Sequence, residues 1–246
     1  MAQKENITGT LDRAERLLGS TVMEQMATKR VIVFGVGGVG SWCVESLVRT
    51  GIRQMTIVDS DRVCASNVNR QLMATTTSIG RPKVEVLKER LLDIAPDAQV
   101  DARMEVFNAE TAHTFHLDDY DYIVDAIDSL ADKMLLIRMA TQTKAVFFSS
   151  MGAALKQDPT KIQVAEFWKV RGCPLARALR QRFKKEKTFP SRKFTCVFSE
   201  ELLKNQPTEQ PAADRGNGSL VQITGIFGFT LAGLVINDIA RRAKEA

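Results

Sequence analysis

The sequence predicts an α/β protein with a doubly wound, mostly parallel Rossmann-like sheet and helices on both of its faces. Three observations support this fold class. Short apolar runs rich in β-branched residues alternate with helix-length segments, the first run leads directly into a glycine-rich loop, and later runs end in acidic residues. Alternation of this kind is typical of βαβ units, whose crossover helices pack on both faces of a parallel sheet. Near the C-terminus the pattern changes, and there we expect a basic helical and loop insertion.

The elements are expected in a regular order. The run 31–34 has the length and composition of a buried parallel strand, and a helical pattern at 41–50 is closed by Gly51, as a glycine after the last turn commonly does. Strand 55–58 then completes the first βαβ unit. We expect the further alternation to comprise helix 82–94, strand 100–103, a short helix 109–115, strand 122–125, helix 131–143 and strand 145–149. Strands 162–165 and 194–198 flank the basic helix.

We expect one domain over 1–246, with a core at 25–170, a basic helix and mobile loop at 171–219, and a buried C-terminal helix at 220–246. Within this plan, 205–219 is rich in Pro, Gln, Asp and Gly, which favours a mobile loop that would act as a lid over the site. The segment 216–237 carries no charge, and its length approaches that of a membrane span. Because Gln222, Thr224 and several glycines dilute it, we expect a helix in the core or in a dimer interface instead.

Composition places the chain among globular proteins of a reducing compartment. Hydrophobic residues make up 44% and charged residues 26% of the chain, which argues against global disorder. The four cysteines are far apart in the sequence, so they indicate neither a zinc clip nor a disulfide framework. The polar N-terminus lacks the apolar stretch of a signal peptide. We therefore expect a cytoplasmic protein.

The glycine-rich loop 35–40 indicates a nucleotide site. Between a strand and a helix, glycines let backbone N–H groups and the helix N-terminus approach a phosphate. Asp59 ends the next strand, nineteen residues after the last of these glycines, where a carboxylate binds ribose hydroxyls; Asp61 follows it as a further candidate. The loop alone fits an NAD-dependent dehydrogenase equally well. The loop glycines taken as nucleotide-binding are Gly35, Gly37, Gly38 and Gly40.

Charge distinguishes ATP from NAD. A dinucleotide pyrophosphate carries two negative charges, whereas ATP carries about four and needs added cations and a metal. Arg70 and Lys83 are placed to neutralise its phosphates, and Asp128, beyond the end of strand 122–125, is the candidate Mg²⁺ ligand. Alternatively, Arg70 and Lys83 are solvated surface groups and Asp128 caps the next helix. The other nucleotide-binding candidates in these segments are Asn67, Asn69, Gln71 and Asp125.

A basic cluster follows the core. Against the single acid Glu186, the stretch 177–193 holds eight basic residues. Such a cluster attracts phosphate backbones, so it is a candidate nucleic-acid surface, although many basic runs are only the solvated face of a helix. The cluster consists of Arg177, Arg180, Arg182, Lys184, Lys185, Lys187, Arg192 and Lys193.

Taken together, the glycine loop, Asp59, the Asn-Arg-Gln triplet 69–71, Lys83 and the stretch 125–128 resemble the adenylating enzymes of the ubiquitin-activating type. That family includes the adenylyltransferases of molybdopterin and thiamine biosynthesis, and the resemblance covers about 10–170. It implies Mg²⁺-dependent attack of a substrate carboxylate on ATP, with Arg70 and Lys83 at the phosphates and Asp128 on the metal. It also implies a homodimer in which Arg13 or Arg16 reaches the neighbouring site.

The stretches 40–42, 126–129, 158–164 and 196–199 are similar to one branch of that family, which dehydrates threonylcarbamoyladenosine beside the anticodon of tRNA. The resemblance implies that the threonylcarbamoyl carboxylate is adenylated with release of pyrophosphate, and that an internal attack then closes a ring and releases AMP. The basic cluster would hold the tRNA backbone.

Two other functions remain open. The first is adenylation of the C-terminus of a small ubiquitin-like sulfur-carrier protein, which the missing paired zinc cysteines disfavour. The second is a nucleotide-sensing or dinucleotide-binding module without chemistry. A sulfur-relay protein is a further candidate partner. Cys196 stands near the place where relatives carry a nucleophilic thiol, but no histidine is close to it in sequence, and lone cysteines are commonly core residues.

Overall fold

The computed structural model describes residues 9–207 and 216–245. They form a seven-stranded sheet in the order β3-β2-β1-β4-β5-β7-β6, in which β6 pairs antiparallel with β7 and the other neighbours pair in parallel. This confirms the predicted α/β class. The strands are β1 (Arg30–Phe34), β2 (Gln54–Val58), β3 (Gln99–Arg103), β4 (Tyr122–Asp125), β5 (Val146–Ser150), β6 (Ile162–Glu166) and β7 (Thr195–Ser199).

The predicted helices lie close to the observed ones, with two differences, and the two helices that precede β1 were not predicted. The segment predicted as a short helix at 109–115 contains only the 3₁₀ turn η2 (Ala112–Phe115), which ends where His116 adopts a left-handed conformation (φ 44°). The helix predicted at 131–143 ends at Ala140. The α-helices are α1 (Asp12–Leu18), α2 (Ser20–Thr28), α3 (Gly40–Thr50), α4 (Lys83–Ile94), α5 (Leu130–Ala140), α6 (Pro174–Glu186) and α7 (Val221–Glu245).

Five 3₁₀ turns complete the secondary structure of the described residues: η1 (Ala65–Asn67), η2 (Ala112–Phe115), η3 (Leu117–Asp119), η4 (Pro159–Lys161) and η5 (Phe167–Lys169). The polar start of the chain and the middle of the predicted mobile loop, 1–8 and 208–215, lie outside the described residues.

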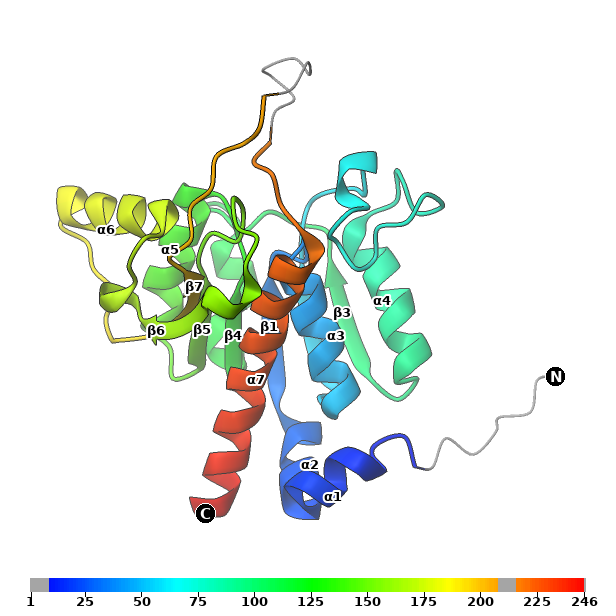
Figure 1. Cartoon of the computed structure of the whole chain (residues 1–246). Coiled ribbons are helices and arrows are strands. Elements are labelled where there is room, and N and C mark those ends of the chain that lie inside the picture. Colours follow the sequence, from blue (N-terminus) through cyan, green and yellow to red (C-terminus); the bar gives the residue numbers. More distant parts are fainter. Residues whose placement is uncertain (1–8, 208–215, 246) are drawn as a thin grey trace.

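Helices cover both faces of the sheet, and the alternation of strand side chains separates two cores. In β1, Val31 and Val33 pack with α2, α3, α4 and α7 on one face, whereas Ile32 and Phe34 pack with α5 and α6 on the other. Figure 1 shows α7 in front of the central strands, with α5 and α6 toward one edge of the sheet and α4 toward the other.

The C-terminal helix α7 is long and apolar enough to cross a membrane, with a mean hydropathy of 1.6, but 56% of its most apolar stretch is buried within the structure. Phe227 and Leu231 are buried in the core. A Cβ atom on Gly228 would lie 2.5 Å from the carbonyl oxygen of Val39, so a glycine here lets α7 pack closely on α3. On another face of the helix, Phe229 remains 48% exposed.

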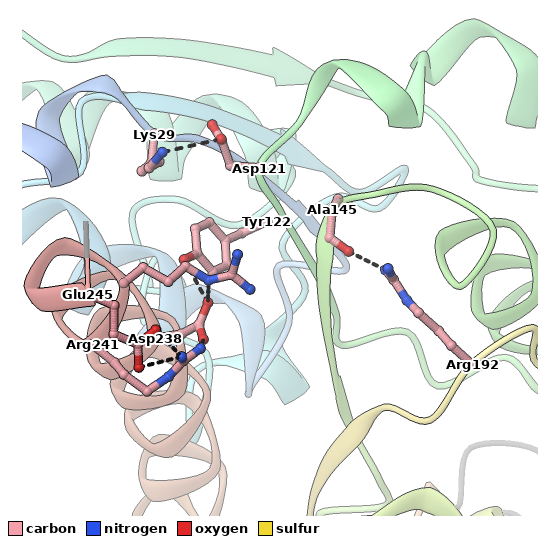
Figure 2. Close-up of polar contacts among 9 residues, drawn as sticks. Lys29, Asp121, Tyr122, Ala145, Arg192, Asp238, Arg241 and Glu245 are labelled. Carbon is pink, nitrogen blue, oxygen red and sulfur yellow. Dashed lines mark hydrogen bonds and ion pairs between the residues drawn. The ribbon is translucent and has the colours of Figure 1, made fainter.

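Polar contacts fasten the end of α7 at the amino edge of the sheet (Figure 2). The Tyr122 hydroxyl donates to Asp238, whose carboxylate also accepts from Arg241 and Arg242. Burial, followed by the hydrogen bond to Asp238, raises the pKa of Tyr122 well above its usual value. The helix is thus fixed to β4 at the edge opposite to the strand ends that form the cavity described next.

Candidate functional site

A cavity of about 650 Å³ opens at the carboxyl ends of β1, β2, β4 and β5. Parallel sheets of this type bind ligands at this edge, where the direction of the crossover connections reverses. Nine of the predicted nucleotide-binding residues line the cavity: Gly35, Gly37, Gly38, Asp59, Asp61, Arg70, Gln71, Lys83 and Asp128.

The glycines of the loop have two different roles. Gly35 adopts φ +82°, and a Cβ atom there would lie 2.8 Å from the Ala126 carbonyl oxygen; a Cβ on Gly40 would lie 1.8 Å from the Gly35 carbonyl oxygen. These two glycines therefore allow the turn to fold against itself and against the end of β4. Gly37 and Gly38 line the cavity directly. The backbone from Gly37 to the start of α3 therefore borders the cavity, where its N–H groups can approach an anionic ligand.

An acidic pair and a lysine form one wall of the cavity. Asp59 accepts hydrogen bonds from the backbone N–H groups of Val36 and Asp61, which ties the glycine loop to the end of β2. Lys83 begins α4, is 5% exposed, and places Nζ 2.7 Å from Asp61 Oδ2 and 3.9 Å from Asp59 Oδ1. Burial raises the pKa of Asp59, although Lys83 acts in the opposite direction. The predicted cation is therefore fixed beside the loop, not solvated.

Arg70 and Gln71 form the next part of the wall. The Arg70 guanidinium donates to the Ser66 carbonyl oxygen at 2.7 Å and to Asn69 Oδ1 at 3.0 Å. Gln71 is 6% exposed, and its Oε1 has no hydrogen-bond partner among the described residues. An unpartnered buried acceptor on a cavity wall marks a place where a ligand can donate a hydrogen bond.

Asp128 lines the cavity and is exposed. It is not the cap of α5, because Ser129 occupies the position before the helix and no side chain caps it. Within 9–207 and 216–245, no three acidic, histidine or cysteine side chains cluster as a metal site. Mg²⁺ commonly uses one or two carboxylates together with phosphate oxygens and waters, so Asp128, with Asp132 also on the cavity wall, fits a metal that is bound jointly with a nucleotide.

Asp125 does not line the cavity, unlike the prediction, and it acts as a buried brace. It is fully buried, and Oδ2 lies 2.8 Å from Lys133 Nζ and accepts from Ser149 Oγ at 2.6 Å. Its Oδ1 accepts from the Ile127 N–H, while Lys133 also donates to the Ile127 carbonyl oxygen. The group thus holds the turn that carries Asp128. Sequence reasoning missed Lys133 and Ser149 because neither belongs to a recognisable motif.

The two asparagines also lie off the cavity wall. Asn67 is 6% exposed, and its Oδ1 accepts from the Cys64 N–H, which closes the turn η1. Asn69 donates from Nδ2 to the Ser219 carbonyl oxygen and accepts from Arg70, so it links the segment before α7 to that arginine. Both residues shape the loop that presents Arg70 and Gln71.

The basic cluster divides into structural and exposed residues. Arg180 donates to the Phe167 carbonyl oxygen, Arg182 pairs with Glu186, and Arg192 donates to the Ala145 carbonyl oxygen (Figure 2). The helix α6 ends at Glu186, so the last members of the cluster lie in the connection to β7. Arg192 is exposed despite this contact, and the exposed members without a side-chain hydrogen bond among the described residues are Arg177, Lys184, Lys185, Lys187 and Lys193.

Cys196 lies in β7, is fully buried and does not line the cavity. Burial raises the pKa of its thiol well above the usual value. A nucleophilic cysteine needs an accessible thiolate, so this position fits a core residue and not the reactive thiol considered from the sequence. Arg13 and Arg16 are exposed on α1, and neither lines the cavity of its own chain.

Comparison with known proteins agrees with this architecture. The chain is 34% identical to the tRNA threonylcarbamoyladenosine dehydratase of Haemophilus influenzae, over 98% of this chain and 97% of that protein. It is also similar to two crystal structures of Escherichia coli tRNA N6-threonylcarbamoyladenosine dehydratase, TcdA, at 32% identity and 96% coverage of both chains. The TM-score is 0.86 for the complex with ATP and 0.88 for the complex with AMP. These likenesses confirm the resemblance predicted from the sequence. With residues 11–245 matched by the ThiF family model, the chain belongs to the ThiF family.

Proposed function

We propose that this chain is an ATP-dependent adenylating enzyme that dehydrates threonylcarbamoyladenosine in tRNA. The observation that carries the proposal is the convergence of the glycine loop, Arg70, Lys83 and Asp128 on one cavity. These groups supply what a triphosphate with its metal requires, and a dinucleotide would not need all of them. The dehydratase names of full-length relatives support the choice of acceptor.

In the proposed reaction, a carboxylate oxygen of the threonylcarbamoyl group attacks the α-phosphorus of ATP, and the bond to the β-phosphate breaks. Arg70 and Lys83 stabilise the negative charge that grows on the departing pyrophosphate. Mg²⁺, held by Asp128, would neutralise further phosphate charge. An internal nucleophile of the substrate then attacks the activated carbonyl carbon, and AMP leaves with the former carboxylate oxygen. The sum of the two steps removes one water from the nucleoside.

Assembly and location complete the proposal. We propose that 1–246 acts as one catalytic unit and works as a cytoplasmic homodimer. The dimer would give a role to Arg13 and Arg16, which are both exposed on α1, at the opposite end of the molecule from the loops that carry the cavity (Figure 1). A contribution of either arginine to phosphate binding therefore requires a second subunit. The exposed Phe229 on α7 supports a partner surface of the same kind.

A pyrophosphate-release assay tests the activity with three acceptors: tRNA that carries threonylcarbamoyladenosine, tRNA without the modification, and a sulfur-carrier protein. We expect ATP turnover only with the modified tRNA. Arg70→Ala should abolish that turnover, whereas Arg62→Ala, which alters an exposed arginine on the same loop that does not line the cavity, should retain it. Turnover driven by the carrier protein would favour the alternative adenylyltransferase, and equal turnover with unmodified tRNA would reject the proposed acceptor.

A further inference from the structure

Two aromatic side chains from different segments meet on the surface and remain uncovered. Trp168 in η5 is 40% exposed, and Phe189, in the connection between α6 and β7, is 54% exposed. Their ring centroids lie 6.2 Å apart with an interplanar angle of 44°. We call Trp168 and Phe189 the aromatic pair. Large exposed rings that gather in this way commonly mark a binding surface.

The aromatic pair rests on a rigid base. Phe167 is fully buried. Its ring centroid lies 5.1 Å from that of Trp168 and 4.9 Å from that of Phe194, on which it stacks. The backbone of this turn is also fixed, because Arg180 donates to the Phe167 carbonyl oxygen and Glu166 accepts from the Trp168 N–H. A ligand that binds to the exposed rings therefore meets a preorganised surface, which reduces the entropy cost of binding.

Exposed basic residues flank both members of the aromatic pair in the sequence. Lys169 follows Trp168 directly, and Lys187 lies two residues before Phe189; both are exposed and form no ion pair among the described residues. Of the nearby acids, Glu186 pairs with Arg182, whereas Glu166 accepts the Trp168 N–H through Oε2 and keeps Oε1 buried without a hydrogen-bond partner among the described residues. The surface therefore offers π faces beside unpaired cations.

This combination matches the chemistry of an unpaired nucleic-acid strand. Cations contact its phosphates, and bases that are not held in a duplex stack on aromatic rings. A paired RNA helix would use the cations but not the rings, because its bases are already stacked. An apolar protein partner would use the rings but leave the unpaired cations without counter-charges.

The pair is connected to the proposed active site by α6. Leu175, in the first turn of this helix, lines the cavity, and the helix ends at Glu186, three residues before Phe189. Thirteen helical residues at about 1.5 Å each span about 20 Å. The exposed Arg177, Lys184 and Lys185 lie on α6 between the two ends. A substrate strand that enters the cavity can therefore follow this helix to the pair.

We propose that Trp168 and Phe189 form a stacking platform for unpaired bases of the RNA substrate, several nucleotides away from the base that reacts. This inference rests on the proposed function for the identity of the RNA. It adds a recognition surface that the basic residues alone do not predict, because cations bind any phosphate backbone whereas the platform selects strands with unpaired bases.

The test compares two labelled RNAs by fluorescence anisotropy: a hairpin with an unpaired loop and a fully paired duplex of the same length. We expect the Trp168→Ala/Phe189→Ala variant to bind the hairpin about 5- to 100-fold more weakly, with unchanged affinity for the duplex and an unchanged salt dependence. The Trp168→Phe/Phe189→Tyr variant, which keeps two rings, should bind as the wild type does. Ile79→Ala, which removes an exposed apolar side chain elsewhere, is the matched control.

A second variant separates stacking from charge. Lys184→Ala/Lys185→Ala should weaken the binding of both RNAs alike, and the slope of log binding constant against log salt concentration should fall by about two. In turnover with modified tRNA, loss of the two rings should raise KM for tRNA and leave KM for ATP and the saturated rate unchanged. Thermal unfolding verifies that each variant is folded. If the Trp168→Ala/Phe189→Ala variant is not folded, the binding of the hairpin by the single variant Phe189→Ala tests the platform instead.

Equal affinity of the wild type and the Trp168→Ala/Phe189→Ala variant for the hairpin would overturn the platform. An equal loss of affinity for the hairpin and for the duplex would also overturn it. A platform that serves a protein partner would give the first of these results. If the wild type prefers the hairpin through these rings but turns over no tRNA, the platform stands and the proposed reaction fails.

Discussion

The buried ion pair of Lys133 and Asp125 gives a sharp prediction about stability. Both side chains are fully buried, and their charged atoms lie 2.8 Å apart. Lys133→Met leaves the Asp125 carboxylate with the Ser149 hydroxyl and the Ile127 N–H but without a counter-charge. Removal of one partner from such a pair costs about 3–5 kcal/mol. Since whole domains are stable by about 5–15 kcal/mol, the variant should lose a large share of its free energy of unfolding.

Urea unfolding at neutral pH measures this loss. Lys133→Met combined with Asp125→Asn removes both charges and keeps an acceptor for the Ile127 N–H, so the double variant should regain most of the lost stability. Arg81→Met, which breaks the exposed pair with Glu89, serves as the control and should shift the midpoint far less. The reasoning is refuted if Lys133→Met unfolds at the wild-type urea concentration, or if the double variant is no more stable than the single one.

Three further variants test the site and its support. Gly35→Ala should lower the melting temperature more than Gly80→Ala does, because both positions have positive φ but only at Gly35 would a Cβ meet backbone atoms; equal losses would contradict this. Asp128→Asn should lower the turnover rate about 100-fold at an unchanged melting temperature, and a wild-type rate would remove Asp128 from the site. Burial alone would raise the pKa of Glu45, but hydrogen bonds, first from Arg90, lower it. The stability that this carboxylate provides is therefore present at neutral pH and lost as the pH falls through its lowered pKa. The stability difference between wild type and Glu45→Gln should accordingly narrow below about pH 4, and a gap that is constant with pH would contradict the pairing.

The sequence predicted the core of the fold and nine residues of the cavity wall because those features are local. A strand, a glycine loop and a helix follow one another directly, and Asp59 ends the next strand, so their proximity follows from one βαβ unit. Lys83 was placed correctly at the cavity for a related reason, since it begins the helix after the loop that carries Arg70. At each of these residues, the motif in the sequence predicted the place that the side chain or backbone occupies in the structure.

Side-chain direction was beyond the reach of the sequence. Asp125 and Asp128 stand three residues apart at the same strand end, yet one is buried against Lys133 and the other lines the cavity. Asn67 likewise belongs to the right loop but bonds to the backbone of Cys64. A motif identifies the loop, whereas packing decides which of its side chains face the ligand.

The sequence also did not predict contacts between distant segments. Trp168 and Phe189 lie on opposite sides of α6 in sequence, and only the path of the chain back to β7 brings their rings together. Arg180 and Arg192 look like members of a uniform basic cluster, but both donate to backbone carbonyl groups. Charge composition predicted the surface, and tertiary structure divided it into structural and exposed residues.

The central claim is tested most directly by mass spectrometry of the nucleosides from tRNA that carries threonylcarbamoyladenosine, after incubation with the protein and Mg²⁺-ATP. The account predicts that the modified nucleoside loses the mass of one water, only when ATP is present, and that one AMP appears for each nucleoside converted. An unchanged nucleoside under conditions in which the protein binds both ATP and the tRNA would contradict it.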